Sequence, residues 1–188
     1  MGFWKNTWNF LWHDDSILSW IVNVIIAFIL VKFVLYPGIG LMLGTDYPIV
    51  AVISGSMEHE ENFENWWQNN EAYYKKYNIT KEAFKTYPFK NGFNKGDIMI
   101  LKGKEPKAIK VGDVVVYQSN LNSNPIIHRV ITITNNGTFM YATKGDHNKI
   151  IDPQPVQEQQ IQHTGIAVFK IPYLGWIKIL FSTLIGGN

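Results

Sequence analysis

The sequence contains no cysteine, and only 17% of its residues are charged, with a formal net charge of +2. The lack of thiols excludes a cysteine nucleophile, a disulfide framework and a thiolate metal site. Such a weak charge gives no basic patch of the kind that binds nucleic acid, so no nucleic-acid partner is expected. The five histidines are scattered and form no His-Glu-x-x-His motif. Neither a metal site nor a cofactor is therefore expected.

One hydrophobic run, residues 17–36, is long enough for a helix to span the hydrocarbon core of a membrane. Its only ionisable residue, Lys32, lies near one end, and the Asp-Asp-Ser of residues 14–16 can cap the helix N-terminus. Tyr36-Pro37-Gly38 is expected to end the helix. A cleavable signal peptide is the competing interpretation, but the run is too long and its leading segment is not strongly basic. We therefore expect a transmembrane anchor over residues 17–36.

Aromatic and apolar segments at both ends of the sequence are predicted to lie in a membrane interface. Within residues 1–16, Trp4, Trp8 and Trp12 recur every four residues and place an aromatic stripe on one helix face. The alternative for this segment is a disordered tail. The apolar C-terminus, residues 176–188, is too short for a second span, so we expect an interfacial helix or an element that covers the core.

Residues 45–175 are predicted to form a mainly β domain. Short apolar runs rich in β-branched residues recur through it, and two of them begin with a Gly-Asp turn. Asn135-Asn136-Gly137 is a suitable hairpin turn between two of these runs. The predicted strands are residues 49–53, 96–101, 112–117, 126–134 and 139–143.

Residues 58–94 interrupt the β pattern with aromatic residues interleaved among Glu, Lys and Asn. Residues 64–76 and 80–85 look helical, and Thr80 can cap the second helix. We therefore predict a helical insertion between two strands. It either shapes a substrate groove or rests on the membrane; the alternative is a solvated aromatic decoration without function.

Candidate catalytic residues lie outside this insertion. Ser54-Gly55-Ser56-Met57 is a small-residue turn in which Gly55 lets the backbone bend sharply and expose a hydroxyl. His128 lies on or at the start of an apolar strand, and Asp146 and Asp152 lie in turns downstream. A serine hydroxyl becomes a nucleophile when a histidine takes its proton and a carboxylate orients that histidine. Taken separately, each residue also has a simpler interpretation, as a turn or a satisfied core residue.

Taken in order, these motifs resemble the type I signal peptidases of the endoplasmic-reticulum kind, which also serve archaea. The resemblance implies a signal-peptidase-like β domain with an N-terminal transmembrane helix. Besides the anchor it covers Ser-Gly-Ser-Met, the two Gly-Asp strands, Ile-His128-Arg-Val, Thr-Lys-Gly-Asp146-x-Asn148 and Ile-Pro-Tyr-Leu-Gly at residues 171–175.

The resemblance implies a role for each candidate residue. Ser56 is the nucleophile, and His128 is the general base where the bacterial branch uses a lysine. Asp152 corresponds to the carboxylate that orients the base, and Asp146 to a second, supporting one. The Ser54 hydroxyl and the Ser56 N–H correspond to the oxyanion hole. A Ser-Lys dyad is not supported, because no lysine lies between Lys110 and the histidine.

The sequence departs from the family's pattern at two places. The family usually has proline two residues after its Met, whereas here Glu58 leads to His59. The family also passes quickly from that point to the first Gly-Asp strand, whereas here the insertion intervenes. His59 is an alternative base, disfavoured because neighbouring side chains on one turn rarely converge.

The implied function is a membrane-anchored serine endopeptidase that removes signal peptides from secreted pre-proteins by cleaving after small residues. Such an enzyme is expected in the cell membrane, single-pass, with its catalytic domain on the extracytoplasmic side. Its expected partners are signal-peptide-bearing pre-proteins, the lipid bilayer and the secretion translocon. The alternatives are a membrane-anchored extracellular binding domain and an inactive subunit of a peptidase complex. Glycosylation sequons at Asn78 and Asn136 are compatible with an external domain under each interpretation.

Overall fold

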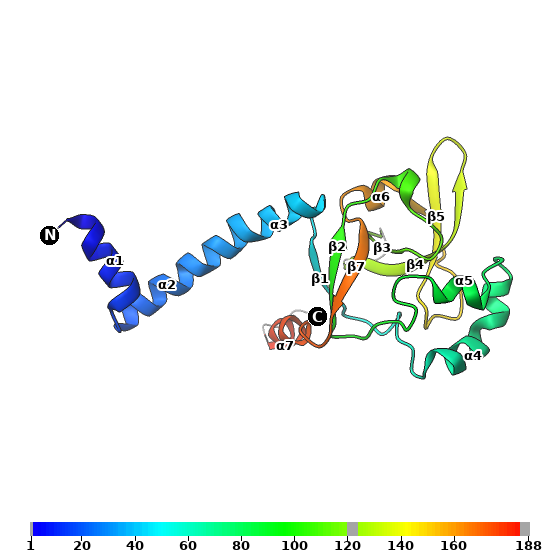
Figure 1. Cartoon of the computed structure of the whole chain (residues 1–188), viewed down its shortest axis with the longest axis horizontal. Coiled ribbons are helices and arrows are strands. Elements are labelled where there is room, and N and C mark those ends of the chain that lie inside the picture. The colour runs from blue at the N-terminus through cyan, green and yellow to red at the C-terminus, as the bar shows by residue number, and fades with distance from the viewer. Residues whose placement is uncertain (1, 120–123, 185–188) are drawn as a thin grey trace. The chain divides into compact units, whose positions relative to one another are not determined.

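A computed structural model describes residues 2–119 and 124–184 of the chain. The chain divides into two units, Met1–Met42 and Leu43–Asn188. The first contains the N-terminal helices and the second contains the sheet and the candidate site (Figure 1).

The N-terminal unit begins with two helices that are connected by side-chain hydrogen bonds. Helix α1 spans Phe3–His13, so the segment that could have been a disordered tail is helical. Helix α2 spans Ile17–Leu30 and is capped by the Ser16 side chain, as the sequence predicts. Ser19 Oγ donates to a carbonyl near the end of α1 over 2.6 Å, and Asn23 donates to another over 2.9 Å. The three tryptophans of the predicted stripe remain more than half exposed.

The apolar helix does not end at Tyr36-Pro37-Gly38, which corrects that prediction. It continues through a π-helical turn, η1 (Val31–Leu35), and helix α3 (Tyr36–Leu43), so that Ile17–Leu43 is a 27-residue helix long and apolar enough to span a membrane. Proline lacks an N–H and normally clashes with the preceding turn. The wider π turn lies just before Pro37 and accommodates it. The helix instead ends at Gly44, whose φ of 65° suits a C-terminal glycine.

The second unit is built on a curled, antiparallel, seven-stranded sheet in the order β1-β2-β7-β3-β4-β5-β6 (Figure 1). The five predicted strands are all present, and the predicted hairpin turn joins β4 to β5. This sheet, with the apolar N-terminal helix, confirms the predicted mainly β fold class. The strands are β1 (Ile49–Ala51), β2 (Ile98–Lys102), β3 (Val114–Tyr117), β4 (Ile126–Asn135), β5 (Phe139–Lys144), β6 (Val156–Gln157) and β7 (Ile166–Ile171).

Two strands of this sheet were not predicted. The short strand β6 pairs with β5, and helix α6 (Glu158–Gln162) follows it. Strand β7 lies between β2 and β3 and therefore joins the two halves of the sheet. Gly165 precedes it with a φ of 84°, and a side chain at that position would collide with the backbone of Lys102. The hydrophobic core extends across both halves of this sheet.

The predicted helical insertion is present but is not a solvated decoration. Helix α4 (Phe63–Lys75) is capped by Asn62, and helix α5 (Lys81–Lys85) is capped by Thr80 as predicted. The aromatic side chains of the two helices point inward and form a cluster with Ile131 of β4. The buried aromatic members of this cluster are Trp66, Trp67, Tyr74 and Phe84.

Two further helices complete the second unit. The short 3-10 helix η2 spans Pro106–Ala108, and the C-terminal helix α7 spans Trp176–Leu184. Helix α7 has no buried residue, so among the described residues it does not cover the core. Its interfacial role stays a prediction. The last part of the predicted C-terminal segment, 185–188, lies outside the described residues.

Candidate active site

The Ser54–Met57 turn is held by the core beneath it. The Met57 side chain is fully buried in the core cluster, and its carbonyl accepts a hydrogen bond from the Phe93 amide over 3.0 Å. The Ser56 carbonyl accepts from the His147 amide over 2.9 Å. The backbone at Ser56 and directly after it is therefore fixed, while the Ser56 hydroxyl itself faces a groove.

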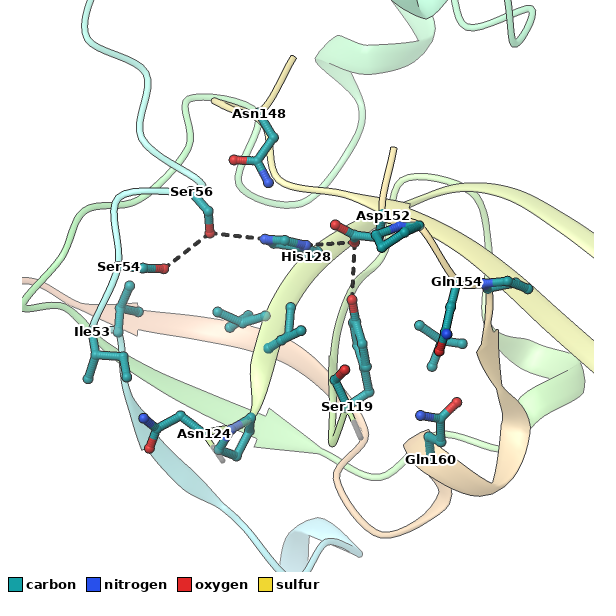
Figure 2. Close-up of a pocket in the computed structure, with 18 of the residues that line it drawn as sticks. Ile53, Ser54, Ser56, Ser119, Asn124, His128, Asn148, Asp152, Gln154 and Gln160 are labelled. Atoms are coloured by element: carbon teal, nitrogen blue, oxygen red, sulfur yellow. Dashed lines mark hydrogen bonds and ion pairs between the residues drawn. The ribbon is translucent and has the colours of Figure 1, made fainter. Parts of the chain in front are cut away.

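Ser56, His128 and Asp152 form a hydrogen-bonded series (Figure 2). Ser56 Oγ lies 3.0 Å from His128 Nε2, and His128 Nδ1 lies 2.7 Å from Asp152 Oδ2. An ionised carboxylate can only accept hydrogen bonds, so the proton between the histidine and the aspartate is on Nδ1. Nε2 is then free to accept the proton of the serine hydroxyl. The three side chains come from the Ser54–Met57 turn, strand β4 and the loop after β5.

The Asp152 carboxylate is held by two further donors that the sequence did not reveal. Thr143 Oγ1 donates to Asp152 Oδ2 over 2.7 Å, and the Tyr117 hydroxyl donates to the same atom over 3.1 Å. Burial acts to raise the pKa of Asp152, but hydrogen bonds from His128, Thr143 and Tyr117 outweigh it and lower that pKa. The carboxylate therefore stays ionised beside the imidazole.

Asp146, the second predicted carboxylate, contacts a different set of groups. Arg129 donates to it through Nε over 2.9 Å and through Nη2 over 2.7 Å. His59 Nε2 lies 3.1 Å from Asp146 Oδ2, and the Tyr74 hydroxyl donates to Oδ1 over 3.3 Å. Burial acts to raise the pKa of Asp146, but the Arg129 charge and the hydrogen bonds hold it well below its usual range. Asp152, not Asp146, is thus the carboxylate bonded to His128.

His59, the alternative base, is directed away from the serine. Its side chain is almost fully buried, and its Nε2 faces Asp146. His128 is the histidine that lies against Ser56 Oγ. Neither Glu58-His59 nor the aromatic pattern of the insertion indicated that His59 would become a partner of Asp146.

Gly145 lies where the candidate residues meet. A Cβ atom on this glycine would lie 2.6 Å from the Ser56 carbonyl oxygen and 2.9 Å from His128 Nε2. These separations are too short for carbon, so any side chain here would displace the nucleophile turn or the base. Glycine in the Lys144-Gly145-Asp146 turn is therefore required by close approach.

The Ser54 hydroxyl and the groove complete the site. Ser54 Oγ lies 3.2 Å from Ser56 Oγ and, like it, lines a groove of about 440 Å³ (Figure 2). The groove is lined by apolar residues, among them Ala51 of β1, Ile53, and Ile126 and Ile127 of β4, and by polar side chains. Residues named in Figure 2 around this groove include Ile53, Asn124, Asn148, Gln154 and Gln160.

Comparison with known proteins finds relatives among the catalytic subunits of signal peptidase complexes. The chain matches no protein-family model. It is 29% identical over 157 residues to the signal peptidase complex catalytic subunit SEC11 of Scheffersomyces stipitis, covering 80% of this chain and 75% of that protein. The SEC11 of Candida tropicalis gives the same values. The human subunit SEC11C is 26% identical over 155 residues, which cover 79% of this chain and 64% of that protein.

The fold and these relatives together support a peptidase with an N-terminal apolar helix. The chain is a homologue of the catalytic subunits of signal peptidase complexes, in agreement with the resemblance to type I signal peptidases of the endoplasmic-reticulum and archaeal type.

Proposed function

We propose that this chain is a membrane-anchored serine endopeptidase that removes N-terminal signal peptides from secreted pre-proteins, cleaving after small residues. The observation that carries the proposal is the series Ser56–His128–Asp152, which opens on a groove in a homologue of signal peptidase catalytic subunits. Serine, histidine and aspartate in this order of hydrogen bonding are the components of a nucleophile, its base and the group that orients the base.

The proposed reaction begins when Ser56 Oγ attacks the scissile carbonyl and its proton passes to His128 Nε2. The tetrahedral oxyanion is stabilised by the Ser54 hydroxyl and the Ser56 amide. When the intermediate collapses, the C–N bond breaks and the histidine donates the proton to the leaving amine. A water molecule then loses a proton to His128 and attacks the acyl-enzyme, releasing the signal peptide and restoring Ser56. Asp152 keeps the imidazole oriented throughout.

The groove suits an extended peptide. Strand β1 is the first strand in the sheet order, so one of its edges has no neighbouring strand among the described residues. The groove begins at this strand and continues past Ser54 and Ser56. An extended substrate adding along that edge would present alternate side chains to the groove. Ile53 and Ile127 line this groove together with the nucleophile, and their apolar groups would favour small side chains there.

The proposed location follows from the substrate. The helix Ile17–Leu43 anchors the chain, single-pass, in the cell membrane, with the unit Leu43–Asn188 on the extracytoplasmic side where signal peptides emerge. The lipid bilayer and the secretion translocon are proposed partners, and pre-proteins are the proposed substrates.

The test of this proposal is cleavage of a pre-protein by the purified full-length chain in detergent. Wild-type protein should cut a pre-protein with alanine before the cleavage point. Changing that alanine to tryptophan should lower kcat/KM about 10²-fold, because a subsite lined by Ile53 and Ile127 would exclude the bulky indole. The position of the cut is read by N-terminal sequencing of the product. No cleavage of the alanine substrate, or equal cleavage of both substrates, would contradict the proposed function.

A second prediction concerns the oxyanion hole. The substitution Ser54→Ala should lower kcat about 10²-fold with little change in KM, because the hydroxyl contacts the developing oxyanion and not the ground state. Gln154→Ala is the matched control, since Gln154 lines the same groove but lies away from Ser56 (Figure 2). An unchanged kcat in Ser54→Ala would remove Ser54 from the oxyanion hole.

A further inference from the structure

The contacts of His59 with the helical insertion and with Asp146 support an inference that rests on the proposed function and extends it. We infer that His59 is a positioning residue: its imidazole, held between Trp66 of α4 and the Asp146 carboxylate, fixes the Lys144–Asn148 turn against the nucleophile. The helical insertion would thereby act on catalysis without touching the substrate.

The position of the His59 ring is set by two contacts. It stacks on Trp66 with ring centroids 3.7 Å apart and an angle of 9° between the planes. Its Nε2 donates to Asp146 Oδ2 over 3.1 Å, because the carboxylate only accepts. Within the described part of the chain its Nδ1 is buried and has no hydrogen-bond partner. The stack and this one hydrogen bond are therefore what aligns the ring.

The turn that contains Asp146 contacts the catalytic residues through its backbone. The Asp146 amide N–H lies 3.4 Å from the Met57 sulfur, directly after the nucleophile. The following amide, of His147, donates to the Ser56 carbonyl over 2.9 Å. The preceding residue, Gly145, approaches both Ser56 and His128 too closely for a side chain. A shift of the Asp146 carboxylate would therefore move the backbone that supports the serine.

The insertion contacts the same region through other aromatic rings. The Arg129 guanidinium lies 4.8 Å from the centre of the Phe84 ring, and Lys144 Nζ lies 5.0 Å from that of Tyr73. Both cations also contact the turn: Arg129 binds the Asp146 carboxylate, and Lys144 donates to the Gly145 carbonyl over 3.0 Å. The insertion is thus packed against the groups that hold this turn, and His59 and the Tyr74 hydroxyl of α4 both contact the Asp146 carboxylate directly.

Two substitutions separate the hydrogen bond of His59 from its stacking. His59→Phe keeps a ring on Trp66 and removes the N–H, whereas His59→Gln keeps an N–H at a similar position and removes the ring. We expect kcat for pre-protein cleavage to fall about 10-fold in His59→Phe, with KM within about 2-fold, because the nucleophile is displaced and substrate binding is not. His59→Gln should recover kcat to within about 3-fold of wild type. His163→Phe, at an exposed histidine paired with Asp46, is the control and should behave as wild type.

A second measurement does not depend on activity. The His147 amide, which donates to the Ser56 carbonyl, should exchange with deuterium about 10-fold faster in His59→Phe than in wild type or His163→Phe. Wild-type kcat in His59→Phe, or an unchanged exchange rate at His147, would overturn the positioning role. If wild-type protein cleaves no pre-protein, the proposed function fails, while the exchange rate still decides whether His59 holds the turn.

Discussion

Replacing Ser56 with alanine is expected to lower kcat for pre-protein cleavage by about 10⁴-fold or more. The hydroxyl is the atom that forms the acyl-enzyme, and the structure places it 3.0 Å from His128 Nε2 with no second hydroxyl nearer to that nitrogen among the described contacts. Ser54 lies 3.2 Å away and is bonded to Ser56 itself. Substrate binding should survive, so KM should change little. Single-turnover cleavage of the alanine-bearing pre-protein measures the loss.

A variant that combines Ser56→Ala with His128→Ala provides a more stringent test of this prediction. If Ser56 and His128 act as one unit, His128→Ala should lose about as much activity as Ser56→Ala, and the double variant should lose no more than either. His163→Ala serves as the histidine control because that side chain is largely exposed and pairs with Asp46. Losses that multiply in the double variant would mean that the two residues contribute separately, which a nucleophile and its base do not.

Local patterns in the sequence were sufficient for most of the fold. Short apolar runs rich in β-branched residues, two of them introduced by Gly-Asp turns, predicted five strands because burial and turn geometry act over a few residues. Strand β7 is not among the predicted strands: Ile166–Ile171 is equally apolar, but no Gly-Asp turn precedes it, and its pairing with β2 and β3 depends on residues far away in the sequence. The end of the apolar helix was also missed. A proline normally ends a helix, and nothing local reveals that a π turn will accommodate Pro37.

In the candidate site, too, residues that belong to local motifs could be predicted, whereas contacts between residues far apart in the sequence could not. Ser56, His128 and Asp152 were assigned from motifs, and the structure brings them together. The partners of Asp146 could not be assigned in this way. The contact between His59 and Asp146 joins residues 87 positions apart, and its geometry depends on how α4 packs. No spacing in the sequence contains that information.

The buried pair Arg129–Asp146 is expected to dominate the stability of the domain. Both side chains are fully buried, and Arg129 also donates to the carbonyls of Pro88 over 2.7 Å and Gly112 over 2.9 Å. Arg129→Met removes the charge, retains much of the volume and leaves the buried Asp146 carboxylate without the arginine that balances its charge. The free energy of unfolding at pH 7 should fall by about 3–5 kcal/mol. Lys107→Met is the control, because its pair with Glu105 is exposed and should contribute about 0–1 kcal/mol.

The pH dependence of this loss tests its cause. In wild type the pKa of Asp146 is held below its ordinary value of 3.8, so the carboxylate stabilises the fold above that value and the contribution is lost as pH falls through the folded pKa. In Arg129→Met, burial acts without the opposing arginine and raises the pKa of Asp146. Acid then protonates the carboxylate and removes the destabilising buried charge from the variant. The difference in unfolding free energy, measured by urea denaturation of the full chain, should therefore be largest at pH 7. It should shrink first as pH falls through the raised pKa of the variant and then further below 3.8, where wild type loses its own contribution. A difference that stays constant down to pH 3 would mean that Arg129 acts through packing and its carbonyl contacts, and not through the charge of Asp146.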